Sequence, residues 1–111
     1  MSFDAYTIAI ELIGSLREPI ARLRLRDASL AEQMQRAAQS VALNVAEGNR
    51  RMGRDRAHLF TIAAGSAAEV RAAIEIAQAW GYVDGASVVG ALALLDRQLA
   101  VLWRLTHGRA S

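Results

Sequence analysis

Two glutamates, Glu47 and Glu69, are the acidic residues best placed for metal or acid–base chemistry, because each lies beside an apolar stripe of helical spacing. Carboxylate metal sites in helical bundles usually add a Glu-x-x-His pair on facing helices. His58 has only Asp55 at that spacing, at the edge of a loop, and His107 lies near the C-terminus. We therefore expect no metal site, no cofactor and no catalytic residue, in a protein that is not an enzyme.

A cluster of arginines ends the stretch SVALNVAEGNRR, residues 40–51, and continues beyond it. All thirteen basic residues of the chain are arginines, whose guanidinium groups suit phosphate and carboxylate partners. The cluster consists of Arg50, Arg51, Arg54 and Arg56. We expect it, reinforced by Arg104 and Arg109, to contact the phosphate backbone of RNA or DNA without reading the bases. The alternative is a solvated turn in which these arginines pair with Asp55 and Glu47.

No nucleotide-binding loop accompanies the arginine cluster. The stretch RMGRDRAH lacks the spacing of a Walker motif and follows a predicted helix. A second set of arginines precedes the first predicted turn and consists of Arg22, Arg24 and Arg26. In an up-down bundle the first and second turns lie at opposite ends, so the two sets form separate patches.

Polar side chains are set among the alanines and valines of two predicted helices. The members of this predicted polar cluster are Arg36, Ser40, Asn44, Glu47, Ser66 and Glu69. Asn44 falls on the apolar seam itself, where an asparagine lowers stability but selects register and oligomeric state. A half-buried carboxylate needs a partner, and Arg36 is the nearest candidate for Glu47. We expect these groups to fix the helix register or to join neighbouring subunits.

Four helices must position all of these residues, and we predict them at residues 4–24, 30–48, 54–80 and 85–106. Apolar residues recur at steps of three and four in each, and nothing alternates with period two. Short turns between the helices predict an all-α fold, an up-down-up-down antiparallel four-helix bundle in a single domain of residues 1–111.

Local signals refine the predicted boundaries. Pro19 interrupts the first helix, so we expect a kink there and a frayed continuation to about Arg24. The sequence Ser29-Leu30-Ala31-Glu32 matches a capping box that would start the second helix. Gly48, Asn49 and Gly53 would end that helix and open a loop, and Asp84 can cap the fourth helix.

The fourth predicted helix carries two adjoining apolar stripes. The main seam is Val88, Leu92, Leu95, Leu99 and Leu102. The second stripe, broken by Gln98 and joined by Trp103, is Ala91, Leu94, Val101 and Leu105. A bundle helix needs one apolar face, so the second stripe suggests a contact with another copy of the chain. The alternative is that both stripes fill a wide core.

The composition bounds the class of protein. With 111 residues the chain has room for one domain, and the absence of cysteine excludes disulfides and thiolate metal sites. The N-terminal stretch carries Asp4 and Glu11 and does not read as a signal peptide. Uncharged runs such as residues 85–95 are shorter than the roughly 20 residues of a membrane span. We expect a cytoplasmic protein with no membrane partner.

Several fixed spacings between about residues 30 and 83 agree with one known pattern. The matching segments are Gln35-Arg36-Ala37-Ala38, Ser40-Val41-Ala42-Leu43-Asn44-Val45-Ala46-Glu47-Gly48, Phe60-Thr61-Ile62-Ala63-Ala64-Gly65-Ser66 with Glu69, and Ala77 with Gly81-Tyr82. On these segments the sequence resembles the four-helix bundle proteins associated with intervening sequences in bacterial 23S rRNA genes. That family includes the accessory variability proteins of diversity-generating retroelements.

The resemblance implies a left-handed bundle that assembles as a homopentamer, with the N- and C-terminal helices contributing to the contacts. For the accessory members it implies binding to nucleic acid and to a reverse transcriptase, and it brings no catalytic residues. We therefore expect a non-catalytic homo-oligomer that presents a ring of arginines to RNA or DNA. The alternative is a protein-binding scaffold or accessory subunit with no nucleic-acid contact.

Overall fold

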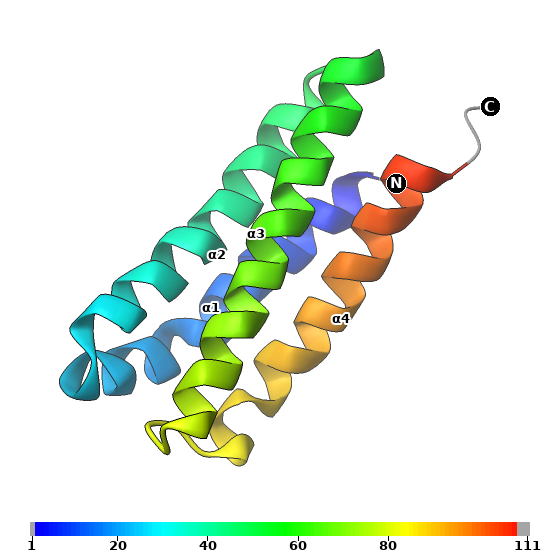
Figure 1. The fold of residues 1–111 in the computed structure, drawn as a ribbon. Coiled ribbons are helices and arrows are strands. Elements are labelled where there is room, and N and C mark those ends of the chain that lie inside the picture. The colour runs from blue at the N-terminus through cyan, green and yellow to red at the C-terminus, as the bar shows by residue number, and fades with distance from the viewer. Residues whose placement is uncertain (1, 109–111) are drawn as a thin grey trace.

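Four antiparallel helices make up the computed structural model, which describes residues 2–108, with side chains from residue 4 onward (Figure 1). They are α1 (Ser2–Arg26), α2 (Ala28–Asn49), α3 (Gly53–Ala79) and α4 (Gly85–His107). Each helix packs against the next, and α4 closes the bundle against α1. The bundle measures 46 × 21 × 19 Å, and residues 2–108 contain no strand. The prediction of an all-α four-helix bundle is confirmed.

Helix α1 continues without a break through Pro19 to Arg26, so the expected interruption and frayed end were wrong, while the kink at Pro19 stays a prediction. Pro19 is itself buried, and Leu16 and Leu23 on either side of it are fully buried in the core. Burial of a leucine side chain stabilises by about 1.5–3 kcal/mol, comparable to the roughly 3 kcal/mol cost of an interior proline. Packing therefore holds the helix together across the missing backbone hydrogen bond.

A single residue, Asp27, connects α1 to α2. Its carboxylate Oδ1 accepts a hydrogen bond from the backbone N–H of Leu30 at 3.0 Å. Asp27 is thus the N-cap of α2, and the capping box predicted from Ser29 to Glu32 was wrong. An aspartate caps a helix as well as a serine does, and here it lies two residues earlier, so α2 begins at Ala28.

The turn between α3 and α4 follows from Gly81 and Asp84. Gly81 has a φ of +77°, which favours glycine, and its N–H donates to the carbonyl of Gln78. The N–H of Tyr82 reaches back to the carbonyl of Ala77 at 2.8 Å, completing a Schellman motif. The carboxylate of Asp84 accepts from the N–H of Ser87 at 2.9 Å, which confirms the predicted cap of α4.

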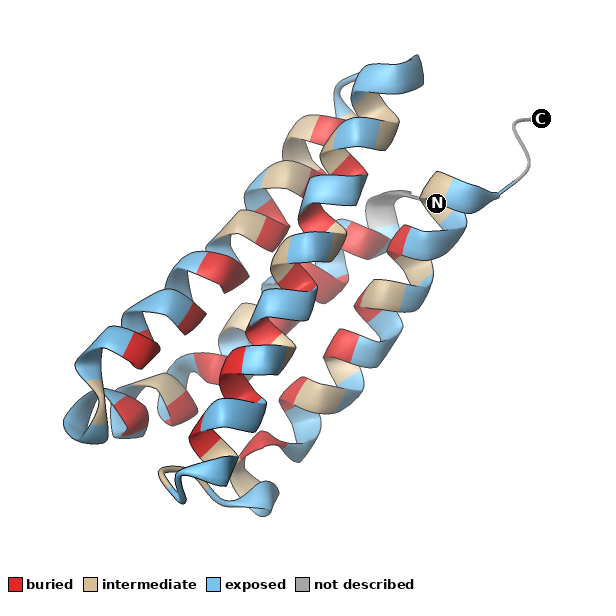
Figure 2. Cartoon of the chain, viewed as in Figure 1, coloured by how far each residue is buried: buried red, intermediate tan, exposed pale blue. Residues whose placement is uncertain are grey.

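Buried positions on all four helices line the interior of the bundle (Figure 2). Their side chains form two clusters along it. The larger cluster extends from the α1–α2 turn past the middle of the bundle. The smaller cluster lies toward the α2–α3 turn and contains Ala5, Val45, Phe60, Ala63 and Leu102. Gly48 lies inside α2 beside this cluster, because a Cβ there would come within 2.6 Å of the Phe60 ring. Gly48 therefore serves packing and does not end the helix.

Helix α4 faces the core along a line that differs from the predicted seam. The buried residues are Val88, Ala91, Leu95, Gln98 and Leu102. Residues of both predicted stripes, such as Leu92 and Leu94, are half-buried against the core, so the two stripes fill a wide core. Gln98 lies between Leu95 of the larger cluster and Leu102 of the smaller one, and its amide has no hydrogen-bond partner among the described residues.

By length and composition alone, α4 could also cross a membrane, and no other helix of the described chain could. In the bundle its buried line packs into the core between α1 and α3. Only 28% of its apolar window is buried in the protomer, so the core position accounts for part of the apolar composition of α4.

Candidate nucleic-acid interface

The turn between α2 and α3 carries the predicted arginine cluster. In Figure 1 this turn lies at the same end of the bundle as the start of α1 and the end of α4, and it projects beyond both. We call residues 50–56 the hairpin tip. Helix α2 ends with Arg50 as its C-cap, and α3 begins at Gly53, whose φ of +63° favours glycine.

The four arginines of the hairpin tip have different surroundings. The guanidinium of Arg51 pairs with the carboxylate of Glu47 one turn earlier on α2. The guanidinium of Arg56 lies 5.0 Å from the ring centroid of Phe60, a cation–π contact with a buried aromatic side chain. Arg50 and Arg54 are exposed, and neither has a partner among the residues that the structure describes. The tip therefore holds two guanidinium groups free to bind an anion.

Arg104 lies at the same end of the bundle but on another side. It lines a hollow of about 310 Å³ between α1 and α4, together with Asp4, Glu11 and Arg97. Two carboxylates therefore share this hollow with two guanidinium groups, and the expected reinforcement of the tip by Arg104 is weaker than an all-arginine patch would give. Arg109, the other arginine expected there, lies outside the described residues.

The second arginine set, at the opposite end of the bundle, is held by contacts within the chain. Arg24 donates to Oε1 of Gln35 at 2.7 Å, and Arg22 pairs with Glu18 at 3.4 Å. The guanidinium of Arg26 lies 5.2 Å above the ring of Tyr82. Within residues 2–108 the two ends of the bundle thus differ, because two of the four arginines at the hairpin tip lack an internal partner and all three of the second set have one.

The predicted polar cluster forms in part. The hydroxyls of Ser40 and Ser66 lie 2.7 Å apart and join α2 to α3. The Asn44 amide donates to the backbone carbonyl of Ser40 at 2.9 Å and to its hydroxyl at 3.0 Å. Asn44 is half-buried beside the seam, because Val45 takes the fully buried position expected for it.

Three predicted members of the polar cluster lie apart from it. Arg36 pairs with Glu32 at 3.4 Å, and Glu47 pairs with Arg51, each one turn away on the same helix. The expected pair of Arg36 with Glu47 was wrong, since eleven residues separate them and about 16 Å of helix lies between them. Glu69 is exposed on α3 and forms no ion pair within the described chain.

Residues 2–108 contain no group of three or more His, Asp or Glu side chains arranged to hold a metal ion. The polar residue that sequence reasoning missed is Gln98, which it treated as a break in an outer stripe. Its spacing of three from Leu95 and four from Leu102 was the available signal, because both leucines are buried.

Comparison with known proteins identifies the family. The model of the 23S rRNA-intervening sequence protein family matches residues 2–103. Among solved structures, a protein with unknown function from the S23 ribosomal protein family of Bacteroides thetaiotaomicron has the same fold, with a TM-score of 0.81 at 14% sequence identity. The match covers 92% of this chain and 97% of that chain. A comparison with curated proteins gave no match. The chain therefore belongs to the 23S rRNA-intervening sequence protein family.

Proposed function

We propose that the protein is a non-catalytic homopentamer whose hairpin tips form a ring that binds the phosphate backbone of RNA or DNA. The observation that carries this proposal is the exposure of Arg50 and Arg54 on a turn that projects beyond the bundle. Neither guanidinium is neutralised by a described residue, whereas Arg22, Arg24 and Arg26 at the other end all have partners.

Assembly would make a strong positive surface from a weakly charged chain. The formal net charge of one copy is only +2, so a single protomer attracts a polyanion weakly. A ring repeats the two free guanidinium groups of each tip around one face. Each phosphate neutralised on duplex DNA steepens the salt dependence of log K by about 0.9. The affinity of the ring for nucleic acid should therefore fall steeply with salt.

We propose that the protein acts in the cytoplasm beside a nucleic-acid polymerase. The resemblance to the accessory variability proteins of diversity-generating retroelements supports a reverse transcriptase as that partner. The protein would then bring template or product RNA or DNA to the enzyme without contributing a catalytic group of its own.

Paired variants at the two ends of the bundle test the proposal. The double variant Arg50→Ser/Arg54→Ser should lose most of the affinity for fluorescently labelled RNA and DNA, measured by anisotropy at low salt. The matched control Arg22→Ser/Arg26→Ser removes the same charge from the other end, leaves the residues that line the groove between α1 and α2 unchanged, and should bind as the unchanged protein does. Equal losses in both variants would reject the hairpin tip as the binding surface. Sedimentation of each variant checks that the oligomer is intact.

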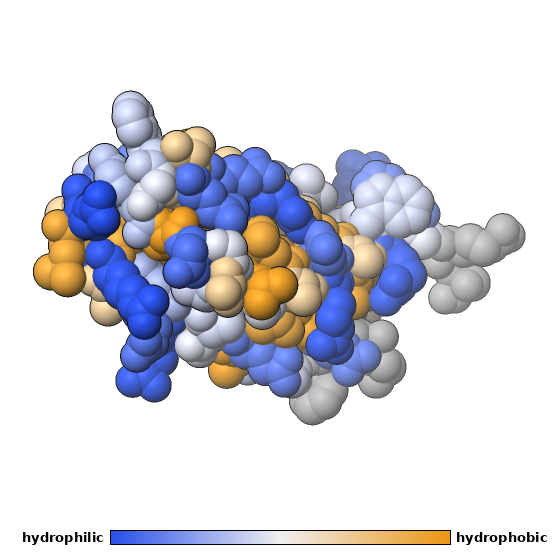
Figure 3. Space-filling model, turned by 90° about the horizontal axis from the view of Figure 1, so that it is seen from below, coloured by the Kyte–Doolittle hydropathy of each residue, from blue (hydrophilic) through white to orange (hydrophobic). Residues whose placement is uncertain are grey.

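The second candidate function is a protein-binding scaffold with no nucleic-acid contact. Large apolar side chains exposed on the bundle favour it, among them Trp80 and Trp103, at 68% and 59% exposure. Figure 3 shows apolar surface between hydrophilic side chains on the face seen from below. Binding through such surface would change little with salt, so a salt titration of any complex separates the two functions.

A further inference from the structure

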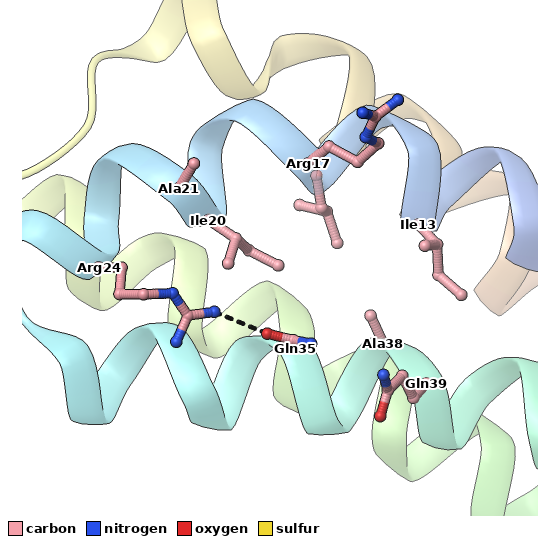
Figure 4. Close-up of a pocket in the computed structure, with 9 residues that line it drawn as sticks. Ile13, Arg17, Ile20, Ala21, Arg24, Gln35, Ala38 and Gln39 are labelled. Carbon is pink, nitrogen blue, oxygen red and sulfur yellow. Dashed lines mark hydrogen bonds between the residues drawn. The ribbon is translucent and has the colours of Figure 1, made fainter.

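An apolar groove follows the outer face between α1 and α2. It consists of two adjoining hollows of about 320 and 440 Å³, which share Ile13 and Gln39 in their linings. In the first hollow, Ile13 and Ile20 project from α1 toward α2 (Figure 4). The second is lined by Tyr6, Ile10 and Leu43, which are 40%, 47% and 68% exposed.

One charge at the rim of this groove is unpaired. The guanidinium of Arg24 donates a hydrogen bond to Gln35 across the groove (Figure 4). Arg17, in the middle of α1, lines the same hollow, is exposed and has no partner within the described chain. The groove therefore combines apolar walls with one available arginine on its α1 rim, whose guanidinium group points away from α2 in Figure 4.

A narrow ridge of exposed residues lies on the outer face of α3, in contrast to the hollow between α1 and α2. Its residues follow at steps of three and four and are all exposed: Ile62, Gly65, Glu69, Ala72 and Ile76. Gly65 lies on this ridge, although a glycine inside a helix costs roughly 0.5–1 kcal/mol relative to alanine. No atom lies within 4 Å of a Cβ built on Gly65, so packing within the protomer gives no reason for a glycine there. A glycine on an outer ridge permits close approach by another chain.

We propose that the α3 ridge of one copy docks into the α1–α2 groove of the next copy. This inference rests on the homo-oligomer proposed above and names the surfaces that build it. The surfaces match in shape, since one is a hollow and the other is the outer, convex face of a helix with an isoleucine at each end. They match in charge, since Arg17 and Glu69 are both unpaired within the described chain. They match in length, since Tyr6–Ile20 and Ile62–Ile76 each span about 21 Å of helix.

The heights of the two surfaces along the bundle also agree. Helices α1 and α3 run in the same direction, and Ala5 shares the smaller core cluster with Phe60 and Ala63. We therefore take Tyr6 of α1 and Ile62 of α3 to lie at the same height along the bundle. Fourteen residues further along each helix, Ile20 and Ile76 are then also at the same height. In a ring whose axis is parallel to the bundle, neighbours differ by rotation alone, so residues at similar height meet. Arg17 and Glu69 differ in height by four residues, or about 6 Å of helix, which a long arginine side chain can span.

The pairing of unlike surfaces determines the kind of assembly. A hollow groove is not complementary to itself, so a two-fold dimer through this face would leave the apolar walls unfilled. Head-to-tail contacts between a groove and a ridge close into a ring when the rotation permits. Rotation about an axis parallel to the helices also brings all hairpin tips to one face, which is the arrangement that the proposed nucleic-acid binding requires.

Cysteine cross-linking tests the contact directly, because the chain has no cysteine of its own. The double variant Leu43→Cys/Ile62→Cys, oxidised at low concentration, should form a ladder of covalent oligomers on a non-reducing gel. Each single variant should remain uncross-linked. The control Leu43→Cys/Val89→Cys, with the second cysteine on exposed α4 surface, should form no ladder.

Charge reversal gives an independent readout. Arg17→Glu or Glu69→Arg alone should raise the dissociation constant of the oligomer by about tenfold, measured by sedimentation, and the two together should restore assembly. Circular dichroism checks that the helices are intact. Absence of a ladder and of rescue in a protein that sediments as an oligomer would overturn the groove–ridge contact and leave the oligomer standing. Sedimentation of the unchanged protein as a monomer would overturn both.

Discussion

The ring of Phe60 packs against the backbone of Gly48 so closely that a Cβ on Gly48 would lie 2.6 Å from a ring carbon. Phe60 is fully buried and is the largest side chain of the smaller core cluster. The contact fixes α2 against α3 directly beneath the hairpin tip, and Arg56 covers the ring from outside.

Gly48→Ala should destabilise the protein by about 1–3 kcal/mol, because overpacking forces the Phe60 ring or the backbone to move. Urea denaturation followed by circular dichroism measures the change. Gly90→Ala is the matched control, since Gly90 lies inside α4 with no atom within 4 Å of a Cβ. That variant should gain about 0.5–1 kcal/mol. Equal effects of the two substitutions would contradict the assigned packing role of Gly48.

Gln98→Leu should stabilise the protein by about 1–3 kcal/mol. Neither amide atom of Gln98 has a partner in the described chain, and a buried polar group without a hydrogen bond costs free energy of this size. Leucine has a similar volume, so the core should accept it. Thermal or urea unfolding measures the gain, and Gln33→Leu, at an exposed position of α2, should change stability by less than about 0.5 kcal/mol. A loss of stability in Gln98→Leu would show that its amide is satisfied in solution.

Ser40→Ala and Ser66→Ala should each lower the free energy of unfolding by about 1 kcal/mol, because each removes the hydrogen bond between the two half-buried hydroxyls. The double variant should cost less than the sum of the two. A double-mutant cycle by urea denaturation should give a coupling of about 0.5–1.5 kcal/mol. Strict additivity would mean that the 2.7 Å contact between the hydroxyls contributes nothing to stability.

Asp27→Ala should cost about 1 kcal/mol, since it removes the acceptor for the N–H of Leu30 at the start of α2. Ser29→Ala should cost less than about 0.5 kcal/mol, because Ser29 is exposed inside the first turn and caps nothing in the structure. Thermal unfolding compares the two variants. A larger effect at Ser29 would restore the capping box that the sequence pattern suggested.

The parts of the fold that depend on repeated patterns could be predicted from the sequence. Apolar spacing located all four helices, and Asp84 was recognised as a cap because only one candidate precedes α4. At the α1–α2 turn two residues could cap, and the choice between Asp27 and Ser29 depends on where α1 ends. That end is determined by burial of Leu16 and Leu23 around Pro19, a tertiary effect that local propensity does not contain.

In the candidate site, too, sequence patterns predict some features and tertiary contacts determine the others. The arginine cluster is visible as composition, but its availability depends on partners such as Glu47 for Arg51 and Phe60 for Arg56. The predicted seam position of Asn44 was wrong by one residue, since α2 places Val45 and not Asn44 in the core. The α1–α2 groove had no sequence signal, because a hollow forms from the spacing of two helices and not from either one.

Because the core is divided at Gln98, the two halves of the bundle should differ in how readily they unfold locally. The smaller cluster holds together the starts of α1 and α3 and the ends of α2 and α4, and few apolar side chains belong to it. Such a region can unfold locally while the rest of a domain stays folded. We therefore expect amide hydrogens around Ala5 and Leu102 to exchange with solvent faster than those around Leu16 and Ile74. The end that carries the hairpin tip would then be the adaptable half of the bundle. It could adjust to an irregular polyanion while the other half keeps its shape.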